Sequence, residues 1–463
     1  MWKMNEERYC ITIDGAERDL EKVRVSAHPF NRVWPGKQRD IQQSEIAYML
    51  RVFGEKPIEV KVQTCEQIGE AVVRPLSKQI RPVIEGNTVS FTIKENGKYS
   101  VEIDGTHHAI HLFYVKQESF AEYGTPTYSF GPGHHEVGLL TLKNGDSVYI
   151  DRDAVVHGSL YAVDASDIKI YGHGILDAGW EIRTQRHGDL GWDGENDFSP
   201  ENVHTYGGIR MYRCKNIMVK GITVTDPASY AISFFATDII QIENVNVVGL
   251  WKYNNDGIDF INSRNIRVKD CFIRSFDDSM CMKGITAFSD MSVENVQISG
   301  CTFWCDWGKN IDIGLATACE QMTNIVWEDC DIIHGNGTCI TISNGQWADI
   351  HDIRYQNIRV EYAYGTEPMV LQETEEQVYQ SNGITAVASL ISITDQRRNW
   401  QGNISFDDAR TKIRNILIDD IQVFMDPRID CEPKVSIRKE TESSLFENIK
   451  ITNVTVNGRS VQI

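Results

Sequence analysis

Residues 265–300 read NIRVKDCFIRSFDDSMCMKGITAFSDMSVENVQISG and contain two copies of one short pattern. The copies begin at Asn265 and Asn295, continue with apolar residues at alternate positions, and end at Asp270 and Gly300. Alternation with a period of two is typical of a β-strand with one buried face. The Gly, Asp or Asn that follows is typical of a turn. This stretch therefore predicts a strand and a bend that recur along the chain.

The same pattern extends in both directions from this stretch. Copies that start at positions 216, 239, 265, 295, 324 and 352 are separated by 23–30 residues, and further copies start at Asp167, Asn415 and Asn448. A nearly constant repeat of one strand-and-turn unit indicates a solenoid, here a right-handed parallel β-helix. A leucine-rich repeat is the competing class, but the units lack its leucine spacing and its helical half. Because coils stack about 4.8 Å apart, residues one repeat apart become neighbours in space.

The first part of the chain has a different organisation. Residues 10–115 contain short alternating runs with closely spaced turn signals at Asn96-Gly97 and Asp104-Gly105. Such turns between alternating runs predict antiparallel hairpins and a small β-sandwich. We therefore predict an all-β protein with an N-terminal β-sandwich domain over residues 1–125. A right-handed parallel β-helix, the catalytic domain, is predicted over residues 126–463.

Composition excludes several classes of function. The 463 residues include 46 Lys and Arg against 65 Asp and Glu, a net charge of −19. Such a surface repels nucleic acids and anionic membranes, so we expect neither as a partner, and it weakly disfavours a polyanionic substrate. We identify no signal peptide and no apolar run of the roughly 18 residues that span a bilayer. The chain has eleven cysteines without the short spacing of a metal-binding pair, which indicates buried thiols and a cytoplasmic protein. A homo-oligomer is possible on this composition.

The densest polar signal lies in residues 251–284. Asp256 and Asp259 flank a Gly-Ile pair, and Asp277 follows Asp256 by 21 residues, a little less than one coil. Asp256 should therefore lie on the coil below Asp277 and Asp278, with three carboxylates on one face. Crowded carboxylates raise one another's pKa, so one can retain a proton as general acid while its partners act as bases.

This arrangement suits the hydrolysis of a glycosidic bond. Carboxyl groups about 6.5–9.5 Å apart give inversion at the anomeric carbon, whereas about 5–5.5 Å gives retention. A Ca²⁺ site is the alternative, because this ion takes several carboxylates, and it would indicate a β-helix lyase or epimerase with Lys283 or Lys309 as the base. A non-catalytic, carbohydrate-binding solenoid is a further alternative.

The window resembles the polygalacturonase family, glycoside hydrolase family 28. The family sequence Asn-Thr-Asp-Gly-Ile-Asp is similar to residues 254–259, and Asp-Asp-Cys-Ile-Ala-Ile-Lys-Ser-Gly is similar to residues 277–284. The resemblance extends from about residue 136 to the end of the chain. It implies an inverting mechanism that needs no metal or other cofactor. It further implies that Asp277 is the general acid, that Asp256 and Asp278 activate water, and that Asn254, Asp259 and Lys283 contact the substrate.

Two positions depart from the family pattern. The family motif Gly-His-Gly-Ile-Ser-Ile-Gly corresponds to residues 308–314, where Lys309 replaces the histidine. A cation there could lower the pKa of the carboxylates or bind a sugar hydroxyl. The family's Arg-Ile-Lys, whose cations hold a galacturonate carboxylate, corresponds to Thr341-Ile342-Ser343. Because hydroxyl groups cannot pair with an anion, Thr341 and Ser343 argue against a uronic acid at the cleavage site.

A second group accommodates these departures. The dextranase and isopullulanase group, glycoside hydrolase family 49, joins a β-sandwich to a similar β-helix and acts on neutral α-glucans, and Trp307-Gly308-Lys309 is similar to it. We therefore expect an inverting hydrolase of neutral, α-linked oligosaccharides. A polygalacturonase that acts on oligogalacturonides remains the alternative.

Two further features concern the substrate. Trp251 and Tyr253, just before the aspartates, are candidates for stacking on sugar rings. Insertions over residues 180–207 and 362–412 interrupt the repeat, and long insertions in solenoids often line the binding face. If they block one end of the groove, the enzyme acts on chain ends, so we expect exo-action.

Overall fold

The computed structural model describes residues 8–27, 41–182, 206–363, 387–395 and 411–462. The two predicted insertions, residues 180–207 and 362–412, lie largely outside the described residues. The described chain consists of β-strands, turns and single-turn 3-10 segments, and no α-helix occurs in these ranges. None of its helical segments has the length and apolar character that crossing a membrane requires.

Ten strands near the N-terminus form two five-stranded sheets that face each other across an apolar core. The first sheet has the order β2 (Ala16–Arg18), β1 (Tyr9–Ile13), β5 (Ile58–Thr64), β8 (Thr88–Ile93) and β7 (Val83–Glu85). The second has the order β3 (Glu21–Ser26), β4 (Ser44–Phe53), β10 (Ile110–Val115), β9 (Gly97–Ile103) and β6 (Ala71–Arg74). Short 3-10 turns lie at Ile41–Gln43, Leu76–Lys78 and Ala121–Tyr123.

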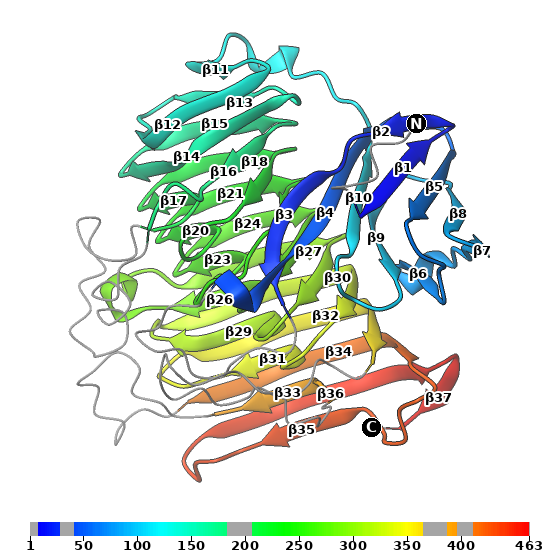
Figure 1. Ribbon diagram of the computed structural model, residues 1–463. Coiled ribbons are helices and arrows are strands. Elements are labelled where there is room, and N and C mark those ends of the chain that lie inside the picture. The colour runs from blue at the N-terminus through cyan, green and yellow to red at the C-terminus, as the bar shows by residue number, and fades with distance from the viewer. Residues whose placement is uncertain (1–7, 28–40, 183–205, 364–386, 396–410, 463) are drawn as a thin grey trace.

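The following strands form a right-handed parallel β-helix, in which hydrogen bonds link 27 strands into one system. Figure 1 shows the coils stacked along one axis from β11 to β37. The strands of the first coils are β11 (Tyr128–Phe130), β12 (Gly133–Thr141), β13 (Ser147–Ile150), β14 (Ala154–Val163), β15 (Ser166–Gly172), β16 (Ile175–Asp177), β17 (Ile209–Tyr212), β18 (Lys215–Lys220), β19 (Thr223–Thr225), β20 (Ile232–Phe235), β21 (Asp238–Glu243) and β22 (Asn246–Val247).

The coils that follow contain the aspartates. Their strands are β23 (Ile258–Ile261), β24 (Arg264–Lys269), β25 (Phe272–Ser275), β26 (Met280–Gly284), β27 (Val293–Ser299), β28 (Thr302–Cys305), β29 (Lys309–Thr317), β30 (Gln321–His334), β31 (Thr338–Ser343), β32 (Asp349–Tyr362), β33 (Ser389–Thr394), β34 (Lys412–Met425), β35 (Lys434–Arg438), β36 (Leu445–Val456) and β37 (Arg459–Val461), with a 3-10 turn at Thr286–Phe288. Parallel pairing joins β17, β20, β23, β26, β29, β31, β33 and β35 into one sheet, which we call the site sheet.

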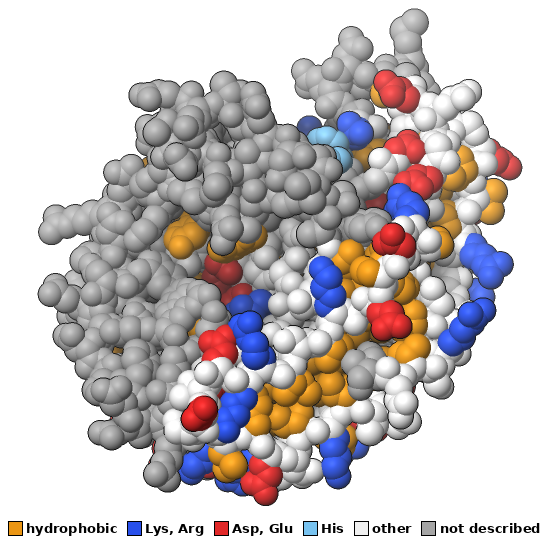
Figure 2. Space-filling model, turned by 90° about the horizontal axis from the view of Figure 1, so that it is seen from below, with side chains coloured by type: hydrophobic (Ala, Val, Ile, Leu, Met, Phe, Trp, Pro, Cys, Tyr) orange, Lys and Arg blue, Asp and Glu red, His pale blue; other side chains and the backbone are white. Residues whose placement is uncertain are grey.

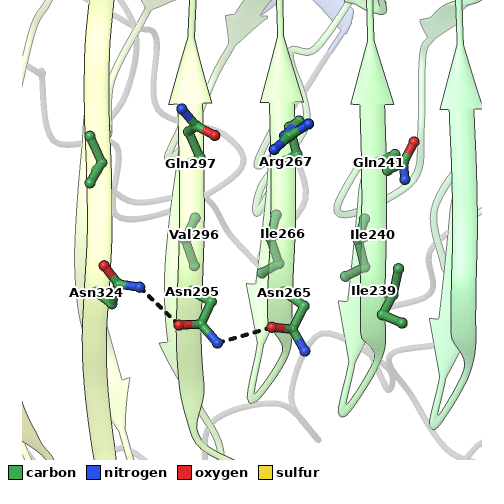
Figure 3. A pocket seen from close by; sticks show the side chains of 11 residues that line it. Ile239, Ile240, Gln241, Asn265, Ile266, Arg267, Asn295, Val296, Gln297 and Asn324 are labelled. Atoms are coloured by element: carbon green, nitrogen blue, oxygen red, sulfur yellow. Dashed lines mark hydrogen bonds between the residues drawn. The ribbon is translucent and has the colours of Figure 1, made fainter.

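Both polar positions of the sequence repeat have a left-handed backbone. Asn265 and Asn295 have φ of 57° and 58°, and the bend residues Asp270 and Gly300 have φ of 55° and 66°. Asn, Asp and Gly tolerate this conformation better than other residues, which explains why the repeat uses them. The asparagines also form a ladder: Asn295 donates to Asn265 at 3.0 Å and Asn324 donates to Asn295 at 2.9 Å (Figure 3).

This ladder borders a shallow groove on the outer face of β21, β24, β27 and β30. Its other labelled lining residues include Gln241, Arg267 and Gln297 (Figure 3). These strands belong to a different sheet from the site sheet, so the groove is separate from the predicted aspartates.

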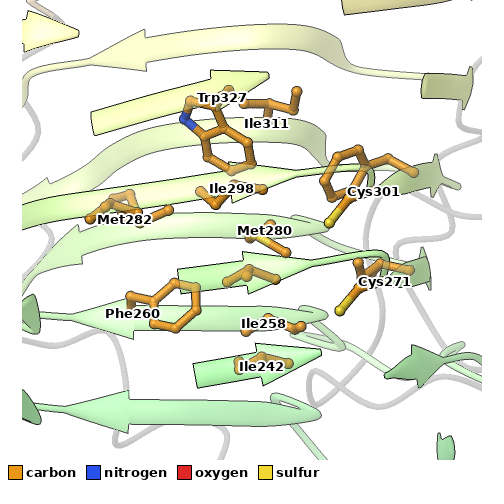
Figure 4. Close-up of a cluster of buried hydrophobic side chains, with 14 of the residues drawn as sticks. Ile242, Ile258, Phe260, Cys271, Met280, Met282, Ile298, Cys301, Ile311 and Trp327 are labelled. Carbon is orange, nitrogen blue, oxygen red and sulfur yellow. The ribbon is translucent and has the colours of Figure 1, made fainter. Parts of the chain in front are cut away.

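Stacked apolar side chains fill the interior of the solenoid. Figure 4 shows residues of successive coils in rows, among them Ile258, Met280 and Ile311 on the site sheet. Cys271 and Cys301 belong to another row, and both are fully buried. None of the eleven cysteines forms a disulfide, and eight of them are buried. The repeat therefore places one apolar layer of side chains on the next.

The β-sandwich lies beside the middle of the solenoid (Figure 1) and packs against it through a mixed interface. Phe113 of β10 contacts Phe272 at a ring-centroid distance of 5.0 Å. Buried charges lie beside this contact: Arg74 of β6 pairs with Glu102 at 2.8 Å and with Glu361 of β32. The interface is therefore an extension of the core that also contains paired charges.

The last described coil carries apolar side chains on its outer end. Partly buried apolar residues of β35 and β36 form a band at this end, which Figure 2 shows from below with charged side chains along its border. Its members are Val435, Phe446, Ile449, Ile451 and Val456. The antiparallel strand β37 pairs with β36 and covers part of this end.

Candidate active site

Four outward-facing residues of the site sheet form a column across successive coils. In the strand register Asp259 of β23 lies beside Cys281 of β26, Cys281 lies beside Asp312 of β29, and Asp312 lies beside Thr341 of β31. All four are buried. Parallel pairing thus brings together side chains that are far apart in the sequence, as the repeat predicted.

Asp256 lies in the loop that leads into β23, and its position is fixed by the residue before it. The side chain of Asn255 accepts hydrogen bonds from the backbone N–H groups of Trp251 and Lys252, and its amide donates to the carbonyls of Pro227 and Ser229. Asn255 is fully buried, so it acts as the internal support of this loop.

Asp277 and Asp278 lie one coil further on, after β25. The backbone N–H of Asp277 donates to the carbonyl of Asn255 at 3.1 Å, and the N–H of Gly257 donates to the carbonyl of Asp278 at 2.8 Å. The two segments are therefore aligned side by side, with Asp256 beside this pair. Asp278 is 7% exposed, whereas Asp277 is only partly buried. The more accessible carboxyl group is thus that of Asp277.

Lys283 connects three of the carboxylates. Its Nζ lies 2.5 Å from Asp256, 2.7 Å from Asp259 and 3.8 Å from Asp278. The ammonium group also lies 4.8 Å from the ring centroid of the partly buried Tyr230. Although burial opposes a charge on Lys283, the carboxylates of Asp256 and Asp259 raise its pKa, so it stays protonated.

The aspartates differ in proton affinity. Burial raises the pKa of Asp256 to about 6. Burial, followed by the negative charges of Asp256 and Asp278, raises the pKa of Asp277 well above its usual range. The carboxylate of Asp277 accepts a hydrogen bond from the backbone N–H of Asp278 at 3.0 Å. At neutral pH this arrangement favours a protonated Asp277 beside an ionised Asp256.

Lys309 lies at the start of β29, in the position of the family histidine. Its backbone N–H donates to Asp278 at 3.1 Å, and its Nζ lies 3.5 Å from Asp278 and 2.6 Å from Asp312. Although burial opposes its charge, Asp278 and Asp312 raise the pKa of Lys309. Lys309 is therefore a permanent cation between two carboxylates.

Thr341 and Ser343 lie on β31, in the coil after Lys309. Both are buried, with exposures of 3% and 6%. In the described part of the chain the hydroxyl oxygen of Thr341 has no hydrogen-bond partner. This hydroxyl group is a buried polar group that brings no charge to the site.

The two predicted stacking residues have different surroundings. Trp251 is only 8% exposed, and its indole N–H donates to Asp226 at 2.9 Å, so little of its ring can contact a sugar. Tyr253 is half-buried and packs on Phe276, which stacks on Trp307 at 5.4 Å. Asn254 is buried and has φ of 55°, the left-handed conformation that asparagine tolerates.

Asp278, Cys281 and Asp312 could also be read as a metal-binding group, because their ligating atoms lie within 4.8 Å of one another. The Lys309 ammonium already contacts both carboxylates of this group. Burial raises the pKa of the Cys281 thiol well above its usual range, and a metal would need the thiolate. The residues present therefore fit an ammonium group better than a metal ion.

Sequence reasoning missed three members of the site: Tyr230, Cys281 and Asp312. Asp312 lies in the motif of residues 308–314, at a position where the family has serine. This difference could have identified Asp312 from the sequence. Tyr230 lies on an earlier coil and has no motif, and only the fold brings it beside Lys283.

Known proteins are similar to this chain in both sequence and fold. The model of the glycosyl hydrolases family 28 matches residues 151–424. A dextranase from Arthrobacter sp. (strain CB-8) is 23% identical over 268 residues, which cover 51% of this chain and 39% of that protein. A dextranase from Arthrobacter globiformis is 22% identical over 268 residues, with the same coverage. The matched region is thus well under two thirds of the length of these relatives.

A solved structure shows the same fold. Dex49A from Penicillium minioluteum has a TM-score of 0.60 at 13% identity, and the match covers 98% of this chain and 90% of that chain. The likeness therefore includes the N-terminal sheets as well as the solenoid.

Proposed function

Because the chain belongs to family 28 of the glycosyl hydrolases, we propose that it hydrolyses the α-glycosidic bonds of a neutral oligosaccharide with inversion at the anomeric carbon. Asp277 donates a proton to the leaving oxygen, and Asp256 and Asp278 activate the attacking water. Whether or not the substrate is neutral, it is a carbohydrate, since the family consists of glycoside hydrolases.

The main support for this proposal is the set of ion pairs that the aspartates form, or do not form, with Lys283. Three carboxylates lie within 3.8 Å of one ammonium group, and that of Asp256 is thereby favoured in the ionised form needed by a base. Asp277 lies outside these ion pairs among the described residues, and its pKa is raised by burial and by its two neighbours. An acid and a base side by side are what glycoside hydrolysis requires.

A neutral substrate is supported by the coil after Lys309. Thr341 and Ser343 can exchange hydrogen bonds with sugar hydroxyl groups but cannot neutralise a carboxylate. Two relatives named dextranase point in the same direction. Family membership itself favours the second candidate, hydrolysis of oligogalacturonides, but the nearby lysines already pair with aspartates.

Exo-action and a cytoplasmic location complete the proposal. The lack of a disulfide among the eleven cysteines supports a reducing compartment. An enzyme in such a compartment meets imported fragments rather than polymers, and short chains favour cleavage from one end. An exo-enzyme releases one product size from the first minutes, whereas an endo-enzyme releases a mixture.

The test is a panel of isomalto-, nigero- and malto-oligosaccharides beside oligogalacturonides, with the anomer of the new reducing end followed by NMR. We expect turnover of an α-linked gluco-oligosaccharide with inversion. Asp277→Asn should lower kcat by about 10²–10⁴-fold, the usual contribution of a general acid. The matched control is Asp270→Asn, an exposed turn residue near the same segment, which should leave kcat unchanged. Retention of configuration, or full activity of Asp277→Asn, would refute the mechanism.

A further inference from the structure

Asp312 is a fully buried carboxylate to which the proposed mechanism gives no role. It lies on β29 between Cys281 and Thr341 in the column of the site sheet. Its Oδ2 accepts hydrogen bonds from Lys309 Nζ at 2.6 Å and from Cys281 Sγ at 3.2 Å. Its Oδ1 has no hydrogen-bond partner within the described ranges. A buried carboxylate is costly unless it is paired, so the contact with Lys309 is what makes it tolerable.

Two lysines lie near Asp278, and Lys309 pairs with fewer other carboxylates than Lys283 does. Lys283 lies 3.8 Å from Asp278 but is 1 Å or more closer to Asp256 and Asp259, at 2.5 Å and 2.7 Å. Lys309 contacts Asp278 with both its backbone N–H and its ammonium group. Of the two lysines, Lys309 therefore controls the position of Asp278.

We propose that Asp312 is a positioning residue, which anchors the Lys309 ammonium group so that Lys309 holds Asp278 oriented toward the attacking water. This inference rests on the proposed function, because it assigns a role within the same reaction. Asp312 touches neither the sugar nor the water, and it acts only through Lys309.

Lys309 and Asp312 both differ from the family motif, and together they form one ion pair. The motif has histidine and serine at the positions of Lys309 and Asp312, three residues apart. A lysine there adds a partly buried positive charge, and an aspartate on the same strand balances it at 2.6 Å. The aspartate alone would be a buried charge without its partner, which is strongly destabilising.

The surroundings predict how removal of Asp312 changes the local field. The charged and titratable groups around it are Lys309 on its own strand, Asp278 on the preceding segment, Cys281 on β26 and Tyr355 on β32, with Lys283 further along β26. Burial raises the pKa of Asp312 to about 7, and Lys309 opposes this rise. The charge of Asp312 is therefore present mainly above about pH 7, and its loss there leaves Asp278 as the one carboxylate that pairs with Lys309 among the described residues.

A double-mutant cycle tests the proposal. It uses Asp312→Asn, Lys309→Met and the double variant, assayed with the α-linked gluco-oligosaccharide that the wild type hydrolyses fastest. Asp312→Asn should lower kcat about 10- to 100-fold, the usual loss for an outer-shell partner, with KM changed less than about twofold. In the Lys309→Met background it should change kcat less than about twofold, because the residue it acts through is gone. The loss of kcat in Asp312→Asn should be larger at pH 8 than at pH 6, because the carboxyl group of Asp312 is mostly protonated at pH 6.

Controls separate positioning from folding. Asp331→Asn removes another buried carboxylate, one that pairs with Arg359 at 2.7 Å on a different strand. It should lower thermal stability without lowering kcat. If Asp312→Asn does not fold, Asp312→Ser, the residue of the family motif, replaces it in the cycle.

Three results would overturn the inference: unchanged kcat in the Asp312 variant, independent losses in the cycle, or a loss of kcat that is the same at pH 6 and pH 8. A wild type that hydrolyses none of the sugars in the panel would contradict the proposed function instead. The two failures are thus distinguishable, because the first requires an active wild-type enzyme.

Discussion

At the scale of single residues, identical side chains have different proton affinities because of their neighbours. Asp256 contacts Lys283 at 2.5 Å, whereas Asp277 has its carboxylate against a backbone N–H group. Burial raises the pKa of both, to about 6 for Asp256 and well above the usual range for Asp277. The separation of the two pKa values allows one to be a base while the other is an acid.

A pH profile follows from these two groups. Asp256 must lose its proton to act as a base, so kcat/KM should rise with pH through about 6 and be roughly tenfold lower at pH 5 than at pH 7. Above neutrality kcat/KM should fall as Asp277 loses its proton. Initial rates from pH 4.5 to 9 measure both limbs, and circular dichroism over the same range checks that the enzyme stays folded. A flat profile between pH 4.5 and 7 would contradict the role of Asp256.

At the scale of elements, the loops between strands set the distances within the site. Gly308 lies in the turn between β28 and β29, against the peptide that joins Asp277 and Asp278. A Cβ atom on Gly308 would lie 2.6 Å from both the Asp277 carbonyl carbon and the Asp278 nitrogen. Such contacts are too short, so a side chain there must displace this peptide.

Gly308→Ala should therefore impair catalysis. A shift of about 1 Å in reacting groups can cost on the order of 100-fold in rate, so we expect kcat to fall by about that factor. The matched control is Gly131→Ala, where a Cβ atom meets nothing within 4 Å. The measurement is kcat for both variants, with the unfolding midpoint as a check on structure. Equal activity of the two variants would show that the Asp277–Asp278 peptide tolerates displacement.

At the scale of the whole molecule, the β-sandwich supports the solenoid. Arg74 of β6 bridges Glu102 of the sandwich and Glu361 of β32, and His334 of β30 pairs with Glu102 at 2.5 Å. Although burial opposes ionisation of Glu102, His334 and Arg74 lower its pKa to about 2. The charges at this interface are therefore mutually dependent.

Removal of Arg74 tests that support. Arg74→Met leaves two carboxylates buried without their cation, so the free energy of unfolding should fall by about 3–5 kcal/mol at pH 7. Burial raises the pKa of Glu361 to about 7, so this carboxyl group gains a proton below that pH and the loss should be smaller at pH 5.5. Urea denaturation at the two pH values measures both effects. The exposed Arg81→Met is the control, expected within about 0.5 kcal/mol of the wild type. An unchanged midpoint in Arg74→Met would contradict this role of the interface.

The sequence by itself determined the β-helix and the approximate placement of the aspartates. Each repeat carries its own apolar alternation and its own left-handed Asn, Asp or Gly, and a pattern that is local and periodic can be recognised without knowing the fold. Once coils stack, a separation of about one repeat brings Asp256 beside Asp278.

Only the tertiary structure decided which charges meet. Lys283 pairs with three carboxylates, and Lys309 pairs with Asp312. The indole N–H of Trp251 donates to Asp226. The repeat length varies between 23 and 30 residues, so the exact register of a side chain depends on loops that carry no periodic signal. Burial, which sets the pKa values, depends on every coil at once. For that reason the catalytic chemistry could be located from the sequence, while its proton distribution required the fold.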